Sequence, residues 1–262
     1  IGKFGGDVDN WMWPRHTGDF SMFRIYCSPD GKPAEYAEEN VPYQPKHHFP
    51  VSLEGVEMGD FAMVLGYPGS TSRYLPSWGV KQVLEMENPN RIKIRGLKQD
   101  IMAETMNKNE KVQIMYAAKY SRSANYWKYS IGQNKGLKRL KVYEKKKQLE
   151  DEFAKWAEKD EKRKEKYGEA LNLIEEAYNK SKTYDHAKQY LRECVFYGTE
   201  IFYFSSTVKA LYKILQNDPE NQGAIKQQVE GIKQRAEDFY KDYYAPLDQK
   251  IVAALLELYY QD

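Results

Sequence analysis

The sequence has few cysteines, no long apolar runs and little net charge. Its 262 residues include only two cysteines, Cys27 and Cys194, which excludes a disulfide scaffold and a zinc site made of cysteines alone. No stretch approaches the roughly 18 consecutive apolar residues that a membrane-spanning helix requires. The 40 basic and 38 acidic residues leave a net charge of +2. No overall field therefore favours binding to nucleic acid or to a membrane surface.

Common motifs of metal and hydrolytic chemistry are also missing. The chain contains no HExxH, no CxxC and no GxSxG segment, and adjacent His47 and His48 would face opposite sides of a strand. We therefore expect no metal and no organic cofactor. The chain begins at Ile1 without a signal-peptide pattern, and we expect it to be an internal or processed piece of a longer protein.

The chain has ample material for a core, and its composition changes along its length. Aromatic residues make up 14% of the total, which argues against a disordered chain. Residues 1–80 hold 6 basic and 10 acidic residues and eight of the eleven prolines, whereas residues 81–262 hold 34 basic and 28 acidic residues. The two parts therefore differ in charge and in backbone preference.

The first part is predicted to form short strands and turns. Residues 19–26 are rich in aromatic and β-branched side chains and are followed by the turn sequence SPDG, a pattern typical of a strand end. Residues 61–67 form a nearly continuous apolar run, which predicts a strand buried on both faces.

The second part is predicted to be helical. The pattern indicates helices over residues 97–131, ending near Gly132 and Gly136, and over 137–182, 184–216 and 219–260. The second of these lacks a large apolar side chain between residues 158 and 166, so we expect it to project or turn there. Pro246 is expected to kink the fourth. Such helices predict an antiparallel bundle.

Residues 135–166 form a basic run that admits two interpretations. It holds 13 basic and 8 acidic residues and could be a nucleic-acid-binding face. Acidic residues are interleaved with the basic ones, as at Glu150, Asp151 and Glu152, which favours ordinary pairing between residues four apart on a solvated helix.

The segment from residue 5 to residue 21 combines glycines with many polar and aromatic side chains. It holds three aspartates, two tryptophans, an asparagine, an arginine and a histidine. Such a loop either binds a ligand or packs between barrel strands, and composition alone does not decide between the two.

Two segments carry a resemblance to a known family. DNWMWPRHTGDFS (residues 9–21) and SRSANYWKY (residues 121–129) resemble signatures of the bacterial serine dipeptidyl-peptidase family of the dipeptidyl-peptidase 7 and 11 type. The resemblance covers the whole chain and implies an α+β fold. Residues 1–84 would be part of a chymotrypsin-like β-barrel, and residues 85–262 would be an α-helical cap domain.

The resemblance also implies roles for four residues. Asp19 looks like the triad aspartate, which orients the catalytic histidine and stabilises its imidazolium form. Asn10 and Trp11 look like part of the site for the free α-ammonium group of the substrate, and Asn125 looks like their partner on the helical part. An ammonium group offers three donors, which side-chain amide and backbone oxygens can accept.

By the same resemblance, the chain alone should be inactive. None of its four histidines matches the triad base, which is expected before Ile1, and the nucleophilic serine is expected after Asp262. The determinant of side-chain preference is expected near that serine. The parent protein would be a serine exopeptidase that releases dipeptides from peptides with a free N-terminus. It would act in the periplasm or at the cell surface of a Gram-negative bacterium, and we leave open whether it forms a homodimer.

Two other functions remain possible from the residues. The chain could be a non-catalytic helical module that binds a protein partner through its long charged helix. A nucleic-acid binder using residues 135–166 is a third reading. A histidine-bearing barrel upstream and a serine-bearing barrel downstream in the reading frame would decide for the enzyme.

Overall fold

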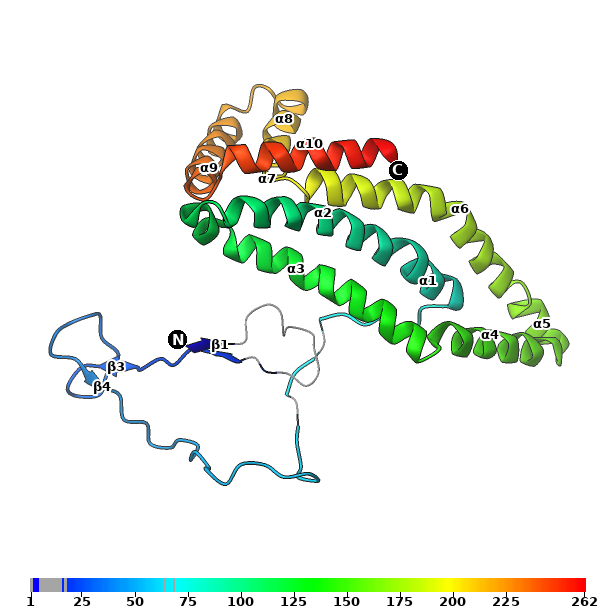
Figure 1. Cartoon of the computed structure of the whole chain (residues 1–262), viewed down its shortest axis with the longest axis horizontal. Helices are drawn as coiled ribbons and strands as arrows, with labels where there is room; N and C mark the ends of the chain where they lie inside the picture. The colour runs from blue at the N-terminus through cyan, green and yellow to red at the C-terminus, as the bar shows by residue number, and fades with distance from the viewer. Residues whose placement is uncertain (1, 5–15, 17, 64, 68) are drawn as a thin grey trace. The chain divides into compact units, whose positions relative to one another are not determined.

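A computed structural model gives the fold of the chain and describes residues 2–4, 16, 18–63, 65–67 and 69–262. The chain divides into two compact units, Ile1–Arg73 and Tyr74–Asp262 (Figure 1). The helical unit thus begins before the expected boundary after residue 84. Pro76, which we had grouped with the proline-rich part, is in fact the N-cap residue of the first helix.

The first unit contains two small antiparallel sheets. Strand β1 (Gly2–Phe4) pairs with β2 (Gly18–Phe20), with Lys3 opposite Asp19. Strand β3 (Tyr26–Cys27) pairs with β4 (Val41–Pro42). The expected strand over residues 19–26 is therefore two short strands, separated by residues 21–25.

The structure does not contain the buried strand that was expected over residues 61–67. None of its described residues lies in a strand, and Phe61, Leu65 and Tyr67 are 88%, 84% and 99% exposed. A strand is buried on both faces only where neighbouring strands and covering layers exist. Among the described residues of this unit, Cys27 is the one buried hydrophobic residue, so no such layers are present.

The second unit is built from helices. Their order and bounds are α1 (Ser77–Gln82), the π-helical η1 (Val83–Glu87), α2 (Asn88–Met106), α3 (Glu110–Arg139), α4 (Val142–Glu158), α5 (Glu161–Tyr167), α6 (Ala170–Tyr190), the π-helical η2 (Leu191–Phe196), α7 (Glu200–Ser205), the 3₁₀ turn η3 (Ser206–Val208), α8 (Lys209–Asn217), α9 (Gln222–Lys241) and α10 (Ala245–Gln261). No helix among the described residues is long and apolar enough to cross a membrane.

Most breaks between these helices have local causes. Asn109, Asp160 and Asn221 each accept a hydrogen bond from a backbone N–H in the first turn of α3, α5 and α9, as N-cap residues do. Lys141 turns the chain between α3 and α4 with a φ of 51°. A Cβ on Gly198 would lie 2.2 Å from the carbonyl oxygen of Glu193, so only glycine fits the turn after η2.

These breaks divide all four expected helices, and the segment 184–216 is divided at residues 197–199. The pattern over residues 97–131 is split by the turn at residues 107–109, and α3 then continues through Gly132 and Gly136 to Arg139. The segment 137–182 contains breaks near residues 160 and 168, close to where a turn was expected. The segment 219–260 is divided at residues 242–244, next to the expected kink, and Pro246 lies in the first turn of α10, where its missing N–H removes no helical hydrogen bond.

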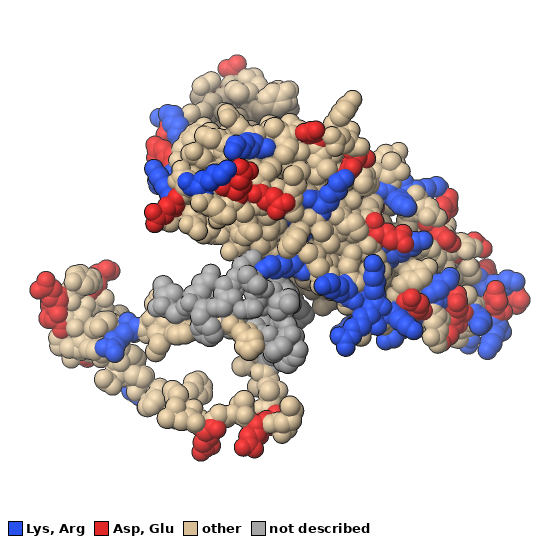
Figure 2. Space-filling model, viewed as in Figure 1, with Lys and Arg blue, Asp and Glu red and all other residues tan. Residues whose placement is uncertain are grey.

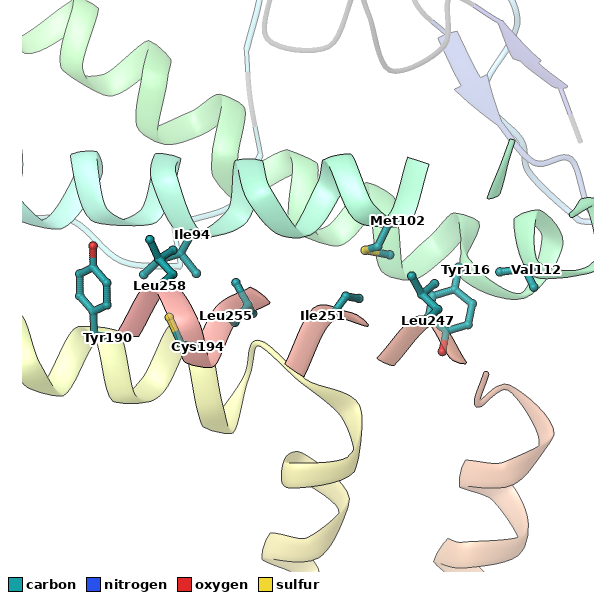
Figure 3. Packing of buried hydrophobic residues seen from close by; sticks show 10 residues of the cluster. All are labelled: Ile94, Met102, Val112, Tyr116, Tyr190, Cys194, Leu247, Ile251, Leu255 and Leu258. Carbon is teal, nitrogen blue, oxygen red and sulfur yellow. The ribbon is translucent and has the colours of Figure 1, made fainter. Parts of the chain in front are cut away.

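One hydrophobic core joins α2, α3, α6, η2 and α10. Ten buried residues form it (Figure 3): Ile94, Met102, Val112, Tyr116, Tyr190, Cys194, Leu247, Ile251, Leu255 and Leu258. Helix α10 supplies four of them and runs beside α2 (Figure 1). Burial of these side chains fixes the positions of the helices around the cavity described below.

The basic run over residues 135–166 is largely a solvated surface. Blue and red side chains alternate over α4 and α5, at the right of Figure 2, and Lys147 pairs with Asp151 at 3.4 Å. Glu150 is the exception to the expected pairing, since it is only 7% exposed. Its carboxylate accepts hydrogen bonds from the backbone N–H and the Oγ of Ser77, both at 2.6 Å.

Candidate functional site

The four residues expected to form the site fall in different parts of the structure. Asn10 and Trp11 lie outside the described residues. The backbone of Asp19 lies in β2, opposite Lys3, while its side chain is outside what the structure describes. Asn125 belongs to the helical unit. The convergence of these four side chains on one site therefore stays a prediction.

Asn125 is exposed on a well-anchored part of α3. Its neighbour Ala124 is 1% exposed, and the indole N–H of Trp127 donates a hydrogen bond to the carbonyl oxygen of Ile92 on α2 at 3.0 Å. These contacts hold the backbone of α3 against α2. Asn125 is thus an exposed residue on a rigid element, as a recognition group should be.

A large cavity lies within the helical unit. It has a volume of about 630 Å³ and opens between α2, α3, η2, α7, α9 and α10. Asn125 does not line it. The charged residues that do are Arg91, Arg95, Lys98, Lys119, Arg122, Arg192, Glu193, Glu200 and Asp248.

The acidic groups of this cavity are all engaged. Glu193 accepts hydrogen bonds from Arg95 at 2.9 and 3.3 Å and lies 3.6 Å from Arg91. Glu200 pairs with Lys119. These pairs are partly buried, so their charges are screened less than those of surface pairs. The two carboxylates thus pair with three of the six basic groups.

Asp248 fulfils a structural role at the edge of the cavity. It is 1% exposed and accepts hydrogen bonds from the backbone N–H groups of Glu200 and Ile201 at 2.9 and 3.0 Å. It therefore caps α7 from a distant part of the chain. Tyr243 also donates to it at 3.3 Å. Burial, aided by the negative charge of Asp248, raises the pKa of Tyr243 to about 12.

Other polar groups of the cavity lack such partners. Among the described residues, neither Lys98 nor Arg122 has a carboxylate within 4.0 Å or a hydrogen-bond partner. The Oγ of Ser123 is buried and has no hydrogen-bond partner either. Burial lowers the pKa of Lys98, and this effect outweighs the attraction of Glu200.

Sequence reasoning missed these cavity residues, although a signal was present. Lys98 lies four residues after Ile94 and four before Met102, both 1% exposed, so it shares their side of α2. Ser123 lies seven residues after the buried Tyr116 on α3. Both residues could have been identified from the sequence, because each is a polar residue at helical spacing from positions that the apolar pattern assigns to the core.

The cavity is suited to binding and has no hydrolytic machinery of its own. Ser123 has no base hydrogen-bonded to its Oγ, as an activated serine would. Burial raises the pKa of the Cys194 thiol to about 12, so the thiolate needed of a nucleophile is scarce. Within the described residues, no group of three or more His, Cys, Asp or Glu side chains could hold a metal ion.

Comparisons with known proteins place the chain in a family. It is 45% identical over 258 residues to dipeptidyl-peptidase 7 of Porphyromonas gingivalis, covering 98% of this chain and 35% of that protein. It is 40% identical to the Asp/Glu-specific dipeptidyl-peptidase of Flavobacterium psychrophilum, covering 99% of this chain and 36% of that one. The chain thus spans about a third of the length of these relatives.

A solved structure gives the same result. DPP11 of Porphyromonas endodontalis in complex with the dipeptide Arg-Glu matches 99% of this chain and 37% of its own, with 37% identity and a TM-score of 0.76. The model of the peptidase S46 family matches residues 1–262. The resemblance inferred from the two sequence segments is therefore confirmed, and the chain belongs to the peptidase S46 family.

Proposed function

We propose that the protein containing this chain is a serine exopeptidase that releases dipeptides from the free N-termini of peptides. The observation that carries the proposal is the 45% identity to a dipeptidyl-peptidase 7 over nearly the whole chain. The DPP11 structures that match the chain are complexes with the dipeptides Arg-Glu and Arg-Asp, which are products of the expected size.

In this proposal the first unit is part of a chymotrypsin-like barrel, and Asp19 is its triad aspartate. The short strands β1 and β2 are compatible with one hairpin of such a barrel, and Asp19 lies in the second of them. An aspartate in this role holds the catalytic histidine in the correct tautomer and stabilises its charged form. The histidine and the serine would come from other parts of the same protein.

The helical unit would act as a cap that measures the substrate. If Asn10, Trp11 and Asn125 hold the α-ammonium group, only the second peptide bond reaches the serine, and the product is a dipeptide. The exposure of Asn125 on an anchored helix supports this role. We also propose a periplasmic or cell-surface location for the protein, as the resemblance implies.

Closure of the cap on the peptide is part of the proposal. Two structures of DPP11 match this chain to different degrees, with a TM-score of 0.76 for the complex with Arg-Glu and 0.55 for the alternate conformation. That protein therefore adopts more than one arrangement. A cap that closes on substrate and opens for release would exclude water during the reaction.

The test is Asn125→Ala in the full-length protein, with Asn179→Ala on the exposed surface of α6 as the matched control. Losing a charge-assisted hydrogen bond to the ammonium group should lower kcat/KM for a peptide with a free N-terminus about 10–150-fold. For the N-acetylated peptide, which the wild type should cleave poorly, the loss should be far smaller.

Three results would contradict the proposal. An equal loss for both peptides would show that Asn125 supports the fold rather than amine recognition. Free cleavage of the acetylated peptide by the wild type would exclude an exopeptidase. Activity of Asp19→Ala within about tenfold of the wild type would exclude Asp19 from the triad, because loss of that aspartate costs about 10⁴ in kcat. The isolated chain itself should be inactive.

A further inference from the structure

The cavity of the helical unit has more positive charge than its acidic groups neutralise. Six basic and three acidic side chains line it. Glu193 forms ion pairs with Arg91 and Arg95, and Glu200 forms one with Lys119. Asp248 accepts hydrogen bonds from two backbone N–H groups at the start of α7. The excess positive charge is therefore carried by side chains for which the described residues supply no carboxylate.

Three of the lining groups offer hydrogen-bond donors that the described residues leave unused. Lys98 and Arg122 carry three and five N–H donors, and neither has a hydrogen bond to a described residue. Ser123 is 7% exposed, and its Oγ is buried without a partner. Buried polar groups are almost always paired in native proteins. The unpaired Oγ of Ser123 and the partly buried ammonium of Lys98 therefore indicate a missing acceptor at this cavity, and the exposed guanidinium of Arg122 lies at its rim.

The rest of the wall is apolar and aromatic. Ile94, Met102 and Ile251 form part of it, together with Tyr126, Tyr203 and Phe239. The volume of about 630 Å³ is in the range of cavities that bind small molecules, whose walls combine apolar surface with a few convergent polar groups. A ligand that fits both parts has an anionic head and an apolar or aromatic body.

We propose that this cavity binds a small organic oxyanion, a carboxylate or a phosphate ester, whose head is held by Lys98, Arg122 and Ser123. An oxyanion supplies acceptors to all three groups and compensates the charge of the partly buried Lys98 ammonium. Tyr126 and Phe239 would contact its apolar body. The site is independent of the proposed peptidase activity, because none of its groups is among those expected to hold the substrate amine.

Helix α3 contributes residues both to the cavity and to the proposed amine site, and all of these residues lie in the segment SRSANYWKY (residues 121–129) or line the cavity elsewhere on α3. Arg122, Ser123 and Tyr126 line the cavity, whereas Asn125 does not. One helix therefore presents two sets of polar groups in different directions. Ligand binding in the cavity would act on the amine site only through the position of α3.

The experiment measures binding to the full chain by isothermal titration calorimetry with four probes. These are 3-phenylpropanoate, its neutral isostere 3-phenylpropanamide, phenyl phosphate and inorganic phosphate, all at equal ionic strength. Binding of 3-phenylpropanoate or phenyl phosphate, with the amide at least about tenfold weaker, is the expected result. The two anionic aromatic probes distinguish a carboxylate ligand from a phosphate ester, and inorganic phosphate tests the head alone.

Variants then assign the binding to this cavity. Lys98→Met should weaken binding of the anionic probes about 10–150-fold, the effect of losing a charge-assisted hydrogen bond. Ser123→Ala should weaken it less and should leave the unliganded chain as stable as before or more so, because it removes an unpaired buried hydroxyl. Lys250→Met, on the exposed surface of α10, removes the same charge outside the cavity and should change nothing.

Three results would overturn the proposal. One is no heat of binding for either anionic aromatic probe while the chain is folded by circular dichroism. Another is equal binding of the acid and the amide, which would show that only the apolar wall is used. The third is an equal loss in Lys98→Met and Lys250→Met, which would show non-specific attraction to a basic surface.

Discussion

Glu150 holds the start of α1 from a position 73 residues away in the sequence. Helix α1 begins at Ser77 and has no side-chain cap of its own, although the first N–H groups of any helix need acceptors. The Glu150 carboxylate takes the N–H and the hydroxyl of Ser77, each at 2.6 Å. Its negative charge also lies at the positive end of the helix dipole.

The cost of removing this contact can be worked out from its burial. Ser77 is 1% exposed and Glu150 is 7% exposed, so water does not replace a lost acceptor. Glu150→Gln keeps one acceptor oxygen and should lower the free energy of unfolding by about 1.5–3 kcal/mol. Glu150→Leu leaves both donors of Ser77 unpaired and should cost about 3–5 kcal/mol.

The assay is urea unfolding followed by circular dichroism at 222 nm, a wavelength that reports helix. Glu152→Gln is the matched control, because Glu152 is exposed on the same helix and accepts a hydrogen bond from Gln148 at 2.9 Å. It should change stability by less than about 0.5 kcal/mol. A double-mutant cycle with Ser77→Ala should give a coupling of about 1 kcal/mol or more. Glu150 variants no less stable than the control, or zero coupling, would refute the reasoning.

Two further predictions concern the cavity. Asp248→Ala should destabilise the helical unit by about 2–4 kcal/mol, because the N–H groups of Glu200 and Ile201 lose a buried charged acceptor; Asp242→Ala on the surface is the control, and equal urea midpoints would contradict the assignment. Lys98→Met should stabilise the unliganded chain by about 1 kcal/mol near neutral pH. Since burial lowers the folded-state pKa of Lys98 below its ordinary value of 10.5, the unfolded chain binds more protons between the two values, and stability should rise with pH through that window. Lys98→Met should lose this rise, and an unchanged pH profile would contradict the burial of a charged Lys98. The titratable or charged groups that line the cavity with Lys98 are Arg91, Arg95, Tyr116, Lys119, Arg122, Tyr126, Arg192, Glu193, Tyr197, Glu200, Tyr203 and Asp248.

Apolar periodicity was enough to predict the helical part but not its joints. The helices α4, α5, α7 and α9 lie within segments predicted to be helical, whereas α2 begins at Asn88, before the predicted start at residue 97. The turn at residues 107–109 was missed because it contains neither glycine nor proline, and the cap is made by Asn109 alone. Gly132 and Gly136 were overinterpreted as an end. A helix interior tolerates glycine at about 1 kcal/mol each when the rest of the helix is well packed, as α3 is against α2.

The strand part was harder to predict because its partners decide its structure. The apolar run at residues 61–67 was expected to be buried, yet Phe61 and Tyr67 are almost fully exposed. Strand pairing depends on residues far away in the sequence, and a run of apolar side chains specifies burial only when a partner surface exists. The roles of Asn10, Trp11, Asp19 and Asn125 came from the family resemblance and not from periodicity, and they remain to be tested.

The cavity illustrates what a departure from the core pattern can mean. Lys98 stands in the row of Ile94 and Met102, and Ser123 stands in a row with Tyr116, so apolar side chains at both positions would continue the core. Instead the chain has an unpaired buried hydroxyl, an unpaired ammonium and a void at one place, each of which lowers stability. A bound oxyanion would remove all three costs together, because it fills the void and accepts from both groups. The exposed lysines of α4 and α5 bear no such cost, since water and neighbouring carboxylates already satisfy them. The buried positive charge of the cavity, rather than the larger basic surface, is therefore where the structure points to a ligand.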